Sequence, residues 1–155
     1  MKYLEVLEIV KREFRLDIFG DHGVYHWFNV YKNTQILARH YGVNSDVFEL
    51  FSYLHDSKRI SEFYDKDHGK RGAEFAKELI SQGVIKLDKK DKKRLIFACE
   101  NHTKANPKNS PINDLIIKIC IDSDRLDLLR VGIIPKKEYL FTDYAKKICE
   151  SFFEM

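Results

Sequence analysis

Apolar residues recur at helical spacing through most of this 155-residue chain, and this periodicity constrains its fold more than any other feature. In the first segment, Leu4, Leu7 and Val10 are spaced so that they share one face of a helix. No segment shows a convincing strand alternation. The sequence therefore predicts an all-α fold, a compact bundle of about seven helices. The expected helices span residues 2–15, 24–41, about 45–56, 70–81, 88–103, 113–130 and 142–153.

Residues that favour helix ends stand between these segments. Gly42 is placed to end the second helix, Asn44 or Ser45 can cap the third, and Asp88 can cap the fifth. Only three prolines and seven glycines interrupt the chain, mostly between the expected helices. Since there is no repeat, low-complexity tract or linker, we expect residues 1–155 to form a single domain.

Composition excludes several classes of protein. The chain is 44% hydrophobic and 33% charged, as in ordinary globular proteins, and its net charge of +3 is weak. The lysines of residues 86–94 are typical of a solvated face, which argues against nucleic-acid binding. We expect no membrane segment, and acidic residues near the N-terminus argue against a signal peptide. Free thiols at Cys99, Cys120 and Cys149 would suit a cytoplasmic protein.

The adjacent pair His55-Asp56 indicates chemistry rather than packing alone. It follows an apolar run that begins at Val47 and ends at Leu54, at the end of an expected buried helix. Burial of a carboxylate beside an imidazole is costly unless something compensates for it. A divalent cation would do so, because it favours an ionised carboxylate and a neutral imidazole together. Adjacent helical residues point about 100° apart, so a shared ion would lie near the helix end.

Three aspartates stand in the second half of the most apolar expected helix. Asp124 and Asp127 are spaced to share a face, whereas Asp122 points elsewhere, so that Asp122 and Asp124 are not expected to bind one ion. An acid in this setting should be paired. The alternative to a metal ligand is a salt-bridge cluster within the helix, formed with Arg125 and Arg130.

The order of His26, His55-Asp56 and Asp124 resembles the HD-domain superfamily of metal-dependent phosphohydrolases over residues 22–132. Four local segments carry the resemblance, and Ser123-Asp124-Arg125-Leu126, which is similar to the family's Ala-Asp-Arg-Leu signature, favours Asp124 over Asp122 as a ligand. The four segments are Leu50–Lys58, His68–Ala76, Glu100–Thr103 and Ser123–Leu126.

Two departures narrow the resemblance. Arg59-Ile60 replaces the Glu-Asp pair of the members that hydrolyse guanosine tetraphosphate. Ser57 replaces the glycine of the cyclic-di-GMP hydrolases, and the chain has no Gly-Tyr-Pro. The chain thus resembles a small stand-alone HD protein without either activity.

The resemblance implies that His26, His55, Asp56 and Asp124 bind one divalent ion. Two nitrogen and two oxygen ligands do not select strongly among Mn²⁺, Fe²⁺, Ni²⁺, Co²⁺, Zn²⁺ and Mg²⁺. Asp56 could also accept a proton from the attacking water.

Other polar residues are secondary candidates. Lys58 and Arg125 adjoin the implied ligands and are expected to act in catalysis by binding phosphate. His68 and His102 could bind a second metal or phosphate, or could be exposed loop histidines. The remaining candidates for the pocket are His22, Arg59 and Arg71, with Lys70 as a further phosphate binder.

These observations predict a phosphomonoesterase or phosphodiesterase that acts on a small phosphorylated metabolite or nucleotide. Two alternatives stay open: a regulatory protein that binds a nucleotide without turnover, and an HD fold with a purely structural metal. The sequence does not indicate an oligomeric state.

Overall fold

The computed structural model describes residues 1–154, and these residues form helices and no strand, which confirms the predicted all-α class. The α-helices are α1 (Leu4–Glu13), α2 (Val24–Tyr41), α3 (Asp46–Leu54), α4 (His68–Ser81), α5 (Lys89–Asn101), α6 (Leu115–Leu126) and α7 (Asp143–Ser151). Three short 3-10 helices complete the fold: η1 (Asp127–Val131), η2 (Lys137–Tyr139) and η3 (Phe152–Glu154).

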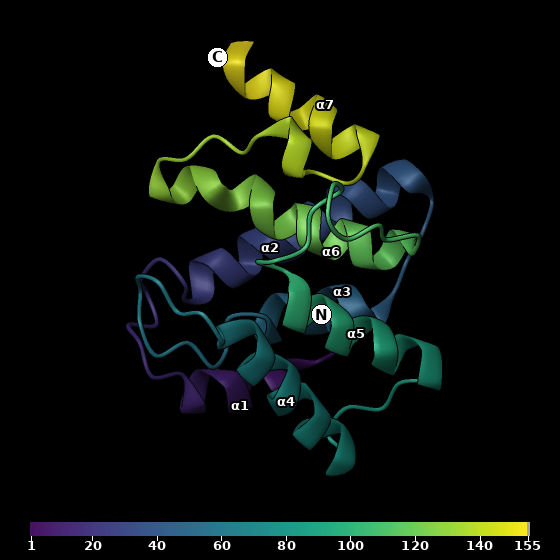
Figure 1. Cartoon of the computed structure of the whole chain (residues 1–155). Helices are drawn as coiled ribbons and strands as arrows, with labels where there is room; N and C mark the ends of the chain where they lie inside the picture. Colours follow the sequence, from purple (N-terminus) through teal and green to yellow (C-terminus); the bar gives the residue numbers. More distant parts are fainter. Residues whose placement is uncertain (155) are drawn as a thin grey trace.

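Helix α3 lies at the centre of the bundle. It contacts α1, α2, α4, α5 and α6, while α2 packs on α6, α4 packs on α5, and α7 covers α6 at the upper end of Figure 1. Every residue of α3 from Val47 to Leu54 is buried, and several of the largest core side chains belong to it. This burial fixes the position of the His55-Asp56 pair, which directly follows α3.

The helix ends follow the local sequence. Ser45 Oγ accepts a hydrogen bond from the amide of Val47 at 3.1 Å and caps α3. Asp88 caps α5 through the amide of Asp91 at 2.8 Å. Gly42 ends α2 in the left-handed conformation, at φ 66°. The predicted roles of Gly42 and Asp88 are confirmed, and Ser45 rather than Asn44 caps α3.

Several predicted boundaries shift by about two residues or more, and two of these shifts bear on the site. Helix α4 begins at His68, which the sequence placed in a loop, because the amide of His68 bonds to the carbonyl of Asp65 and starts the first turn early. Helix α6 ends at Leu126 rather than at residue 130, since the chain tightens there into η1 and stops at Gly132, which has φ 77°. His68 therefore stands at the first turn of α4, and Asp124 stands in the last turn of α6.

Two glycines allow α4 to approach its neighbours closely. A Cβ atom at Gly69 would lie 2.7 Å from the carbonyl oxygen of Cys99 on α5. A Cβ atom at Gly72 would lie 2.7 Å from the carbonyl oxygen of Leu54 at the end of α3. No larger residue fits these contacts without displacement of the backbone. The glycines thus allow His68 to approach the ends of α3 and α5.

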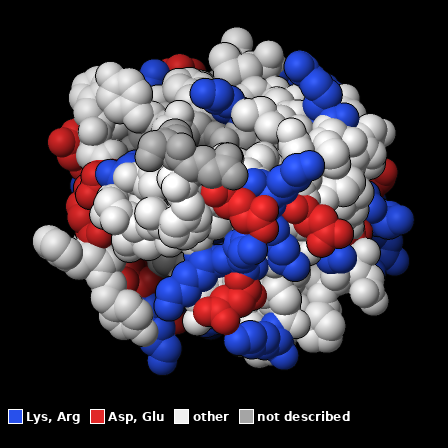
Figure 2. All heavy atoms as spheres, turned by 90° about the horizontal axis from the view of Figure 1, so that it is seen from above, with Lys and Arg blue, Asp and Glu red and all other residues white. Residues whose placement is uncertain are grey.

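The surface mixes charges of both signs. Seen from the α7 end, basic and acidic side chains alternate with broad uncharged areas (Figure 2). One such pair joins Lys137 and Glu150 at 2.7 Å. Among the described residues, no helix combines the length and the apolar character needed to cross a bilayer.

Candidate metal centre

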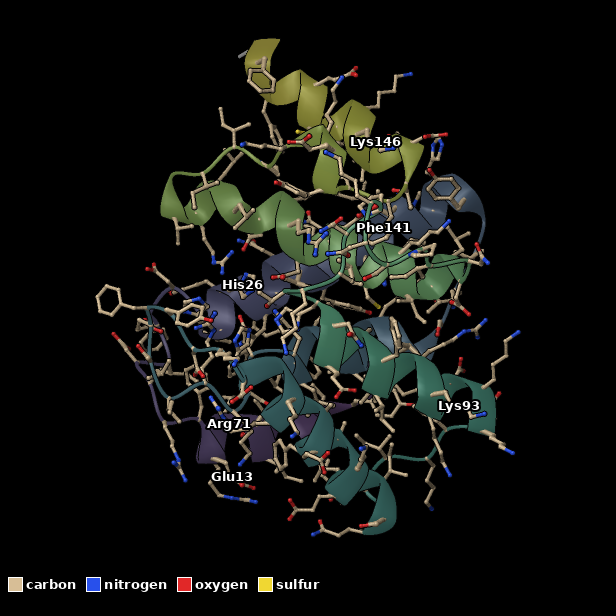
Figure 3. All side chains as sticks on the ribbon, in the orientation of Figure 1. Glu13, His26, Arg71, Lys93, Phe141 and Lys146 are labelled. Carbon is tan, nitrogen blue, oxygen red and sulfur yellow. The ribbon has the colours of Figure 1, made fainter. Side chains whose placement is uncertain are left out.

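The histidines and aspartates implied by the sequence meet where five helices begin or end. His26 stands in the first turn of α2, and Figure 3 shows it facing the region between α2 and the lower helices. His55 follows α3 and His102 follows α5, while His68 begins α4. A side chain at a helix end has no further helical turn beyond it. Side chains from several helix ends can therefore meet in a small volume.

The first ligand group consists of His26, His55, Asp56 and Asp124. The Nε2 atoms of His26 and His55 lie 3.0 Å apart. Asp124 Oδ1 lies 3.1 Å from His26 Nε2 and 3.4 Å from His55 Nε2. Asp56 Oδ2 lies 3.3 Å and 3.5 Å from the same two nitrogens. Ligands about 2.1 Å from a metal stand about 3.0 Å apart at a right angle and about 3.4 Å apart at a tetrahedral angle.

A second group consists of Asp56, His68 and His102. The Nε2 atoms of the two histidines lie 3.0 Å apart, as in the first group. Asp56 Oδ1 lies 3.3 Å from His68 Nε2 and 3.4 Å from His102 Nε2. Asp56 therefore presents one carboxylate oxygen to each group, an arrangement that could bridge two ions.

The four ring orientations are fixed from outside the cluster. The Nδ1 atom of His55 lies 2.9 Å from the carbonyl oxygen of Phe51. His68 Nδ1 and His102 Nδ1 lie 2.6 Å and 2.7 Å from the carbonyl oxygens of Asp65 and Cys99. A carbonyl only accepts, so each Nδ1 carries the proton. In the neutral rings, each Nε2 then presents a lone pair to the cluster.

His26 has a different outer partner. Its Nδ1 lies 2.7 Å from Asp127 Oδ2, and Asn29 donates to the other oxygen of Asp127 at 3.1 Å. Metal-binding histidines usually donate their second N–H to a carboxylate or carbonyl. The sequence reasoning missed this role for Asp127. Its position three residues after Asp124, on the same helix face, was the available signal.

The electrostatics of the cluster favour a cation. Burial lowers the pKa of His26, but hydrogen bonds with Asp124, Asp127 and Asp56 outweigh it and raise the pKa to about 10. Burial raises the pKa of Asp56, yet the surrounding histidines hold it well below its usual value. The carboxylates thus stay ionised and draw positive charge into a buried volume. Pairs of Nε2 atoms 3.0 Å apart beside two carboxylates fit a divalent metal ion, which would take the place of the proton on His26.

A cleft of about 530 Å³ opens onto the cluster. Asp56, His68, His102 and Asp124 line it, together with His22, Arg59, Glu62 and Arg130. Both His68 and His102 are buried, so the alternative of exposed loop histidines is wrong.

Two of the predicted pocket residues stand in this cleft. Arg59 Nε lies 3.4 Å from Asp56 Oδ1, and His22 Nδ1 lies 3.1 Å from Glu62 Oε1. Burial lowers the pKa of His22. The cleft therefore combines a guanidinium group and a neutral imidazole with the ligand cluster.

Lys58 and Arg71 lie elsewhere. Lys58 Nζ pairs with Glu13 at 2.9 Å and stands over the ring of Phe75. Arg71 pairs with Asp65 at 2.5 Å and donates to the carbonyl of Lys58 at 3.0 Å. Figure 3 shows Arg71 on the side of α4 towards Glu13 and away from His26. The structure thus does not bring Lys58 to the cluster as the sequence predicted, nor Arg71 to its cleft. Lys70 is exposed on α4.

Arg125 binds backbone carbonyl groups next to the ligand cluster. Its guanidinium donates to the carbonyl oxygen of Tyr139 at 2.6 Å, to that of His102 at 3.1 Å, and to that of Ala105. These bonds occupy its terminal nitrogens, so the arginine positions the backbone beside His102 rather than presenting a free charge to phosphate. Of the alternative salt-bridge cluster, Arg125 forms no ion pair within residues 1–154, whereas Arg130 lies 3.8 Å from Asp127.

Asp122 and Asp124 have separate environments. Asp122 accepts hydrogen bonds from the amides of Phe141 and Thr142 and from the hydroxyl of Thr142, each at 2.8 Å. It therefore ties α6 to the start of α7. The preference for Asp124 as the ligand agrees with this geometry.

Comparisons with known proteins agree with the fold. No family model matches the chain, and no curated protein matches it. Among solved structures, it is similar to the crystal structure of a predicted HD superfamily hydrolase from an uncultured Thermotogales bacterium. The two share 27% sequence identity with a TM-score of 0.73, and the alignment covers 97% of this chain and 84% of that one.

Proposed function

We propose that this chain, whose fold is similar to that of a predicted HD superfamily hydrolase, is a metal-dependent phosphohydrolase acting on a small phosphorylated metabolite or nucleotide. One observation carries the proposal. Four buried imidazoles, each fixed by its Nδ1 atom, direct Nε2 towards two ionised carboxylates at the base of an open cleft.

The ligand groups support two ions. His26, His55, Asp56 and Asp124 would hold the first, and Asp56, His68 and His102 the second. Bound there, divalent ions would activate a water molecule as a nucleophile and neutralise charge on the phosphoryl group. Asp56 contributes to both groups, so its two oxygens set the spacing between them.

The chain supplies the remaining functions from the cleft walls. Arg59 donates to Asp56 and to the carbonyl oxygens of Ser61 and Phe63, while Arg130 donates to the carbonyl oxygens of Asp21 and Asp127. In each arginine the second terminal nitrogen, Nη2, makes no hydrogen bond within residues 1–154. These NH2 groups are placed to bind phosphate oxygens. His22 belongs to neither ligand group and can carry a proton to or from the substrate.

A purely structural metal fits the site less well. Structural sites are closed by four protein ligands, whereas this cluster opens to the cleft through Asp56 and Asp124. The side chain of Asp124 keeps 17% of its surface exposed. The open side of the cluster would leave room for a phosphate oxygen beside the ion.

Metal analysis and an activity screen test the proposal. The purified protein is expected to retain divalent metal, and with Mn²⁺, Ni²⁺ or Mg²⁺ to hydrolyse p-nitrophenyl phosphate, bis(p-nitrophenyl) phosphate or a nucleotide. Asp56→Ala should lose bound metal and turnover together, because Asp56 serves both groups. Lys58→Ala is the matched control, since it changes a nearby charge that points away from the cluster.

The outcomes separate the alternatives. Full metal stoichiometry in Asp56→Ala would overturn the ligand assignment. Bound metal and bound nucleotide without hydrolysis of any ester would indicate a sensor. Metal that chelators remove only on unfolding, with no phosphate ester bound, would indicate a structural ion.

A further inference from the structure

A second hollow of about 250 Å³ shares a wall with the cleft over the metal centre. Thr103, Arg125 and Leu128 line both spaces. Thr103 Oγ1 lies 3.3 Å from Nε2 of His68, so the hollow begins at the second ligand group. A molecule with its phosphate at the metal centre could therefore extend past Thr103 into this hollow.

The surface of the hollow is mostly apolar, although Thr103, Asn106, Arg125 and Lys136 place polar groups at its edge. Ala105, Leu128, Pro135 and Leu140 supply the apolar surface, and Tyr139 adds an aromatic ring that is 43% exposed. Such a lining favours a flat group with few hydroxyls over a polyol, which would need a hydrogen-bonding partner for each hydroxyl.

Asn106 contributes a directed polar group. Its Oδ1 atom accepts hydrogen bonds from the amides of Lys108 at 2.9 Å and Asn109 at 3.2 Å. These bonds orient the side-chain amide, and its Nδ2 group donates to no acceptor within the described residues. The hollow thus offers a hydrogen-bond donor beside an aromatic ring.

The walls of the hollow are tied to the metal centre by Arg125. Its guanidinium joins the backbone of Ala105 and Tyr139 on the walls to that of His102 in the second ligand group. Buried hydrogen bonds from a charged donor hold these segments in fixed relation. The distance between the hollow and the cluster is therefore set by one side chain.

We propose that this hollow receives the organic part of the substrate and selects a planar, weakly polar ring, such as the base of a nucleoside monophosphate. The proposal rests on the proposed function and names its substrate class. Tyr139 would stack on the ring and Asn106 Nδ2 would donate to a ring acceptor. Both are specificity residues and neither belongs to the ligand cluster.

Phe63 offers a rival platform. It lines the cleft over the metal centre and is 87% exposed. Its ring stands free of the hollow, whose lining does not include it. We favour the hollow because walls on several sides bury more of a ring than one exposed side chain does.

Nucleoside binding tests the subsite without hydrolysis. Adenosine and uridine, which lack phosphate, would be titrated into isotope-labelled protein and followed by amide chemical shifts, with ribose as the control ligand. The amides of Thr103, Asn106 and Tyr139 should shift, and ribose should leave them unchanged. Tyr139→Ala should weaken binding about tenfold, whereas Tyr139→Phe should retain it.

Two further variants sharpen the test. Asn106→Asp keeps an oxygen for the amides of Lys108 and Asn109 but loses the donor, so it should weaken binding. Phe63→Ala should leave nucleoside affinity unchanged. Failure of the wild type to bind any nucleoside, or a loss of affinity in Phe63→Ala but not in Tyr139→Ala, would overturn the proposal.

The subsite and the proposed function fail separately. If nucleosides shift the amide signals of the hollow but the protein hydrolyses no phosphate ester, the subsite proposal stands and the proposed hydrolase function is wrong. If glycerol 3-phosphate and nucleoside monophosphates are hydrolysed at equal rates and no nucleoside binds, the hydrolase function is supported and the subsite proposal is wrong.

Discussion

Asp127 Oδ2 lies 2.7 Å from His26 Nδ1, on the side of the ring opposite the ligand cluster. The corresponding nitrogens of His55, His68 and His102 meet backbone carbonyls instead. A carboxylate makes the imidazole more basic than a carbonyl does, so His26 should be the strongest nitrogen ligand.

Replacement of Asp127 therefore tests how the outer partner affects metal affinity. Asp127→Asn keeps the shape of the side chain but removes its charge, and should weaken divalent-metal binding by roughly 10- to 100-fold. Competition with a chelator measures the affinity. Asp143→Asn, at the exposed start of α7, is the control. Equal affinities in the wild type and Asp127→Asn would contradict the assigned role.

Asp122 and Asp124 should respond to mutation in opposite ways. Asp122→Ala leaves the buried donors of Thr142 and the amide of Phe141 unpaired, and should lower the free energy of unfolding by about 3 kcal/mol. Asp124→Ala should cost less in the chelator-treated protein but should abolish the stabilisation that added Mn²⁺ provides. Urea unfolding with and without metal distinguishes the two. A metal-dependent gain retained in Asp124→Ala would count against Asp124 as a ligand.

The close approach at Gly72 predicts a packing defect. Alanine favours helices over glycine by about 1 kcal/mol, but a Cβ atom here would meet the Leu54 carbonyl at 2.7 Å. We expect Gly72→Ala to lower stability by about 2 kcal/mol and to weaken metal binding, because α4 must move away from His55. Denaturant unfolding and metal titration check this result. Lys70→Ala, exposed on the same helix, should change stability by less than about 0.5 kcal/mol. A neutral Gly72→Ala would show that the backbone relaxes freely.

The link between α5 and α6 should depend on pH. Asp114 caps α6 through Ile117 and accepts from Arg94 at 2.8 Å. Burial raises the pKa of Asp114, but Arg94 and the capping amides lower it by a larger amount. The pKa of Asp114 in the folded protein therefore lies below the usual 3.8. The ionised carboxylate therefore stabilises the fold above that value, and this contribution is lost as the pH falls through the folded pKa.

Asp114→Asn keeps a capping oxygen and removes the charge. It should be less stable than the wild type by about 1 kcal/mol at neutral pH, and the difference should disappear as the pH falls below 3.8 and through the lower folded pKa of Asp114. Thermal unfolding across this range measures both variants. A difference that persists in acid would assign the effect to the cap geometry instead.

Local sequence predicted the parts of this molecule that depend on neighbours along the chain. The spacing of apolar residues located α2 and α5 closely, and Gly42 and Asp88 marked helix ends. The ligand order led to His26 and Asp124, because each residue type occurs in a recognisable local context.

The features that sequence reasoning missed depend on tertiary contacts. Lys58 adjoins the ligands in sequence, yet its long side chain turns to Glu13 on α1. Arg125 serves three backbone carbonyls on segments that the sequence does not place. The pairing of Asp127 with His26 joins residues 101 positions apart, and the spacing of Asp127 from Asp124 indicates a shared face but not this partner.

The position of the ligands at helix ends bears on how chains of this kind can diverge. A residue inserted within α3 would rotate His55 by about 100°, whereas one inserted between α3 and α4 would only lengthen a connection. Descendants of one ancestor can thus change loop lengths and most side chains and still keep the metal centre. Sequence alignment then fails to detect such relatives, whereas superposition of their helices still detects the common fold. A TM-score of 0.73 at 27% identity fits that mode of divergence.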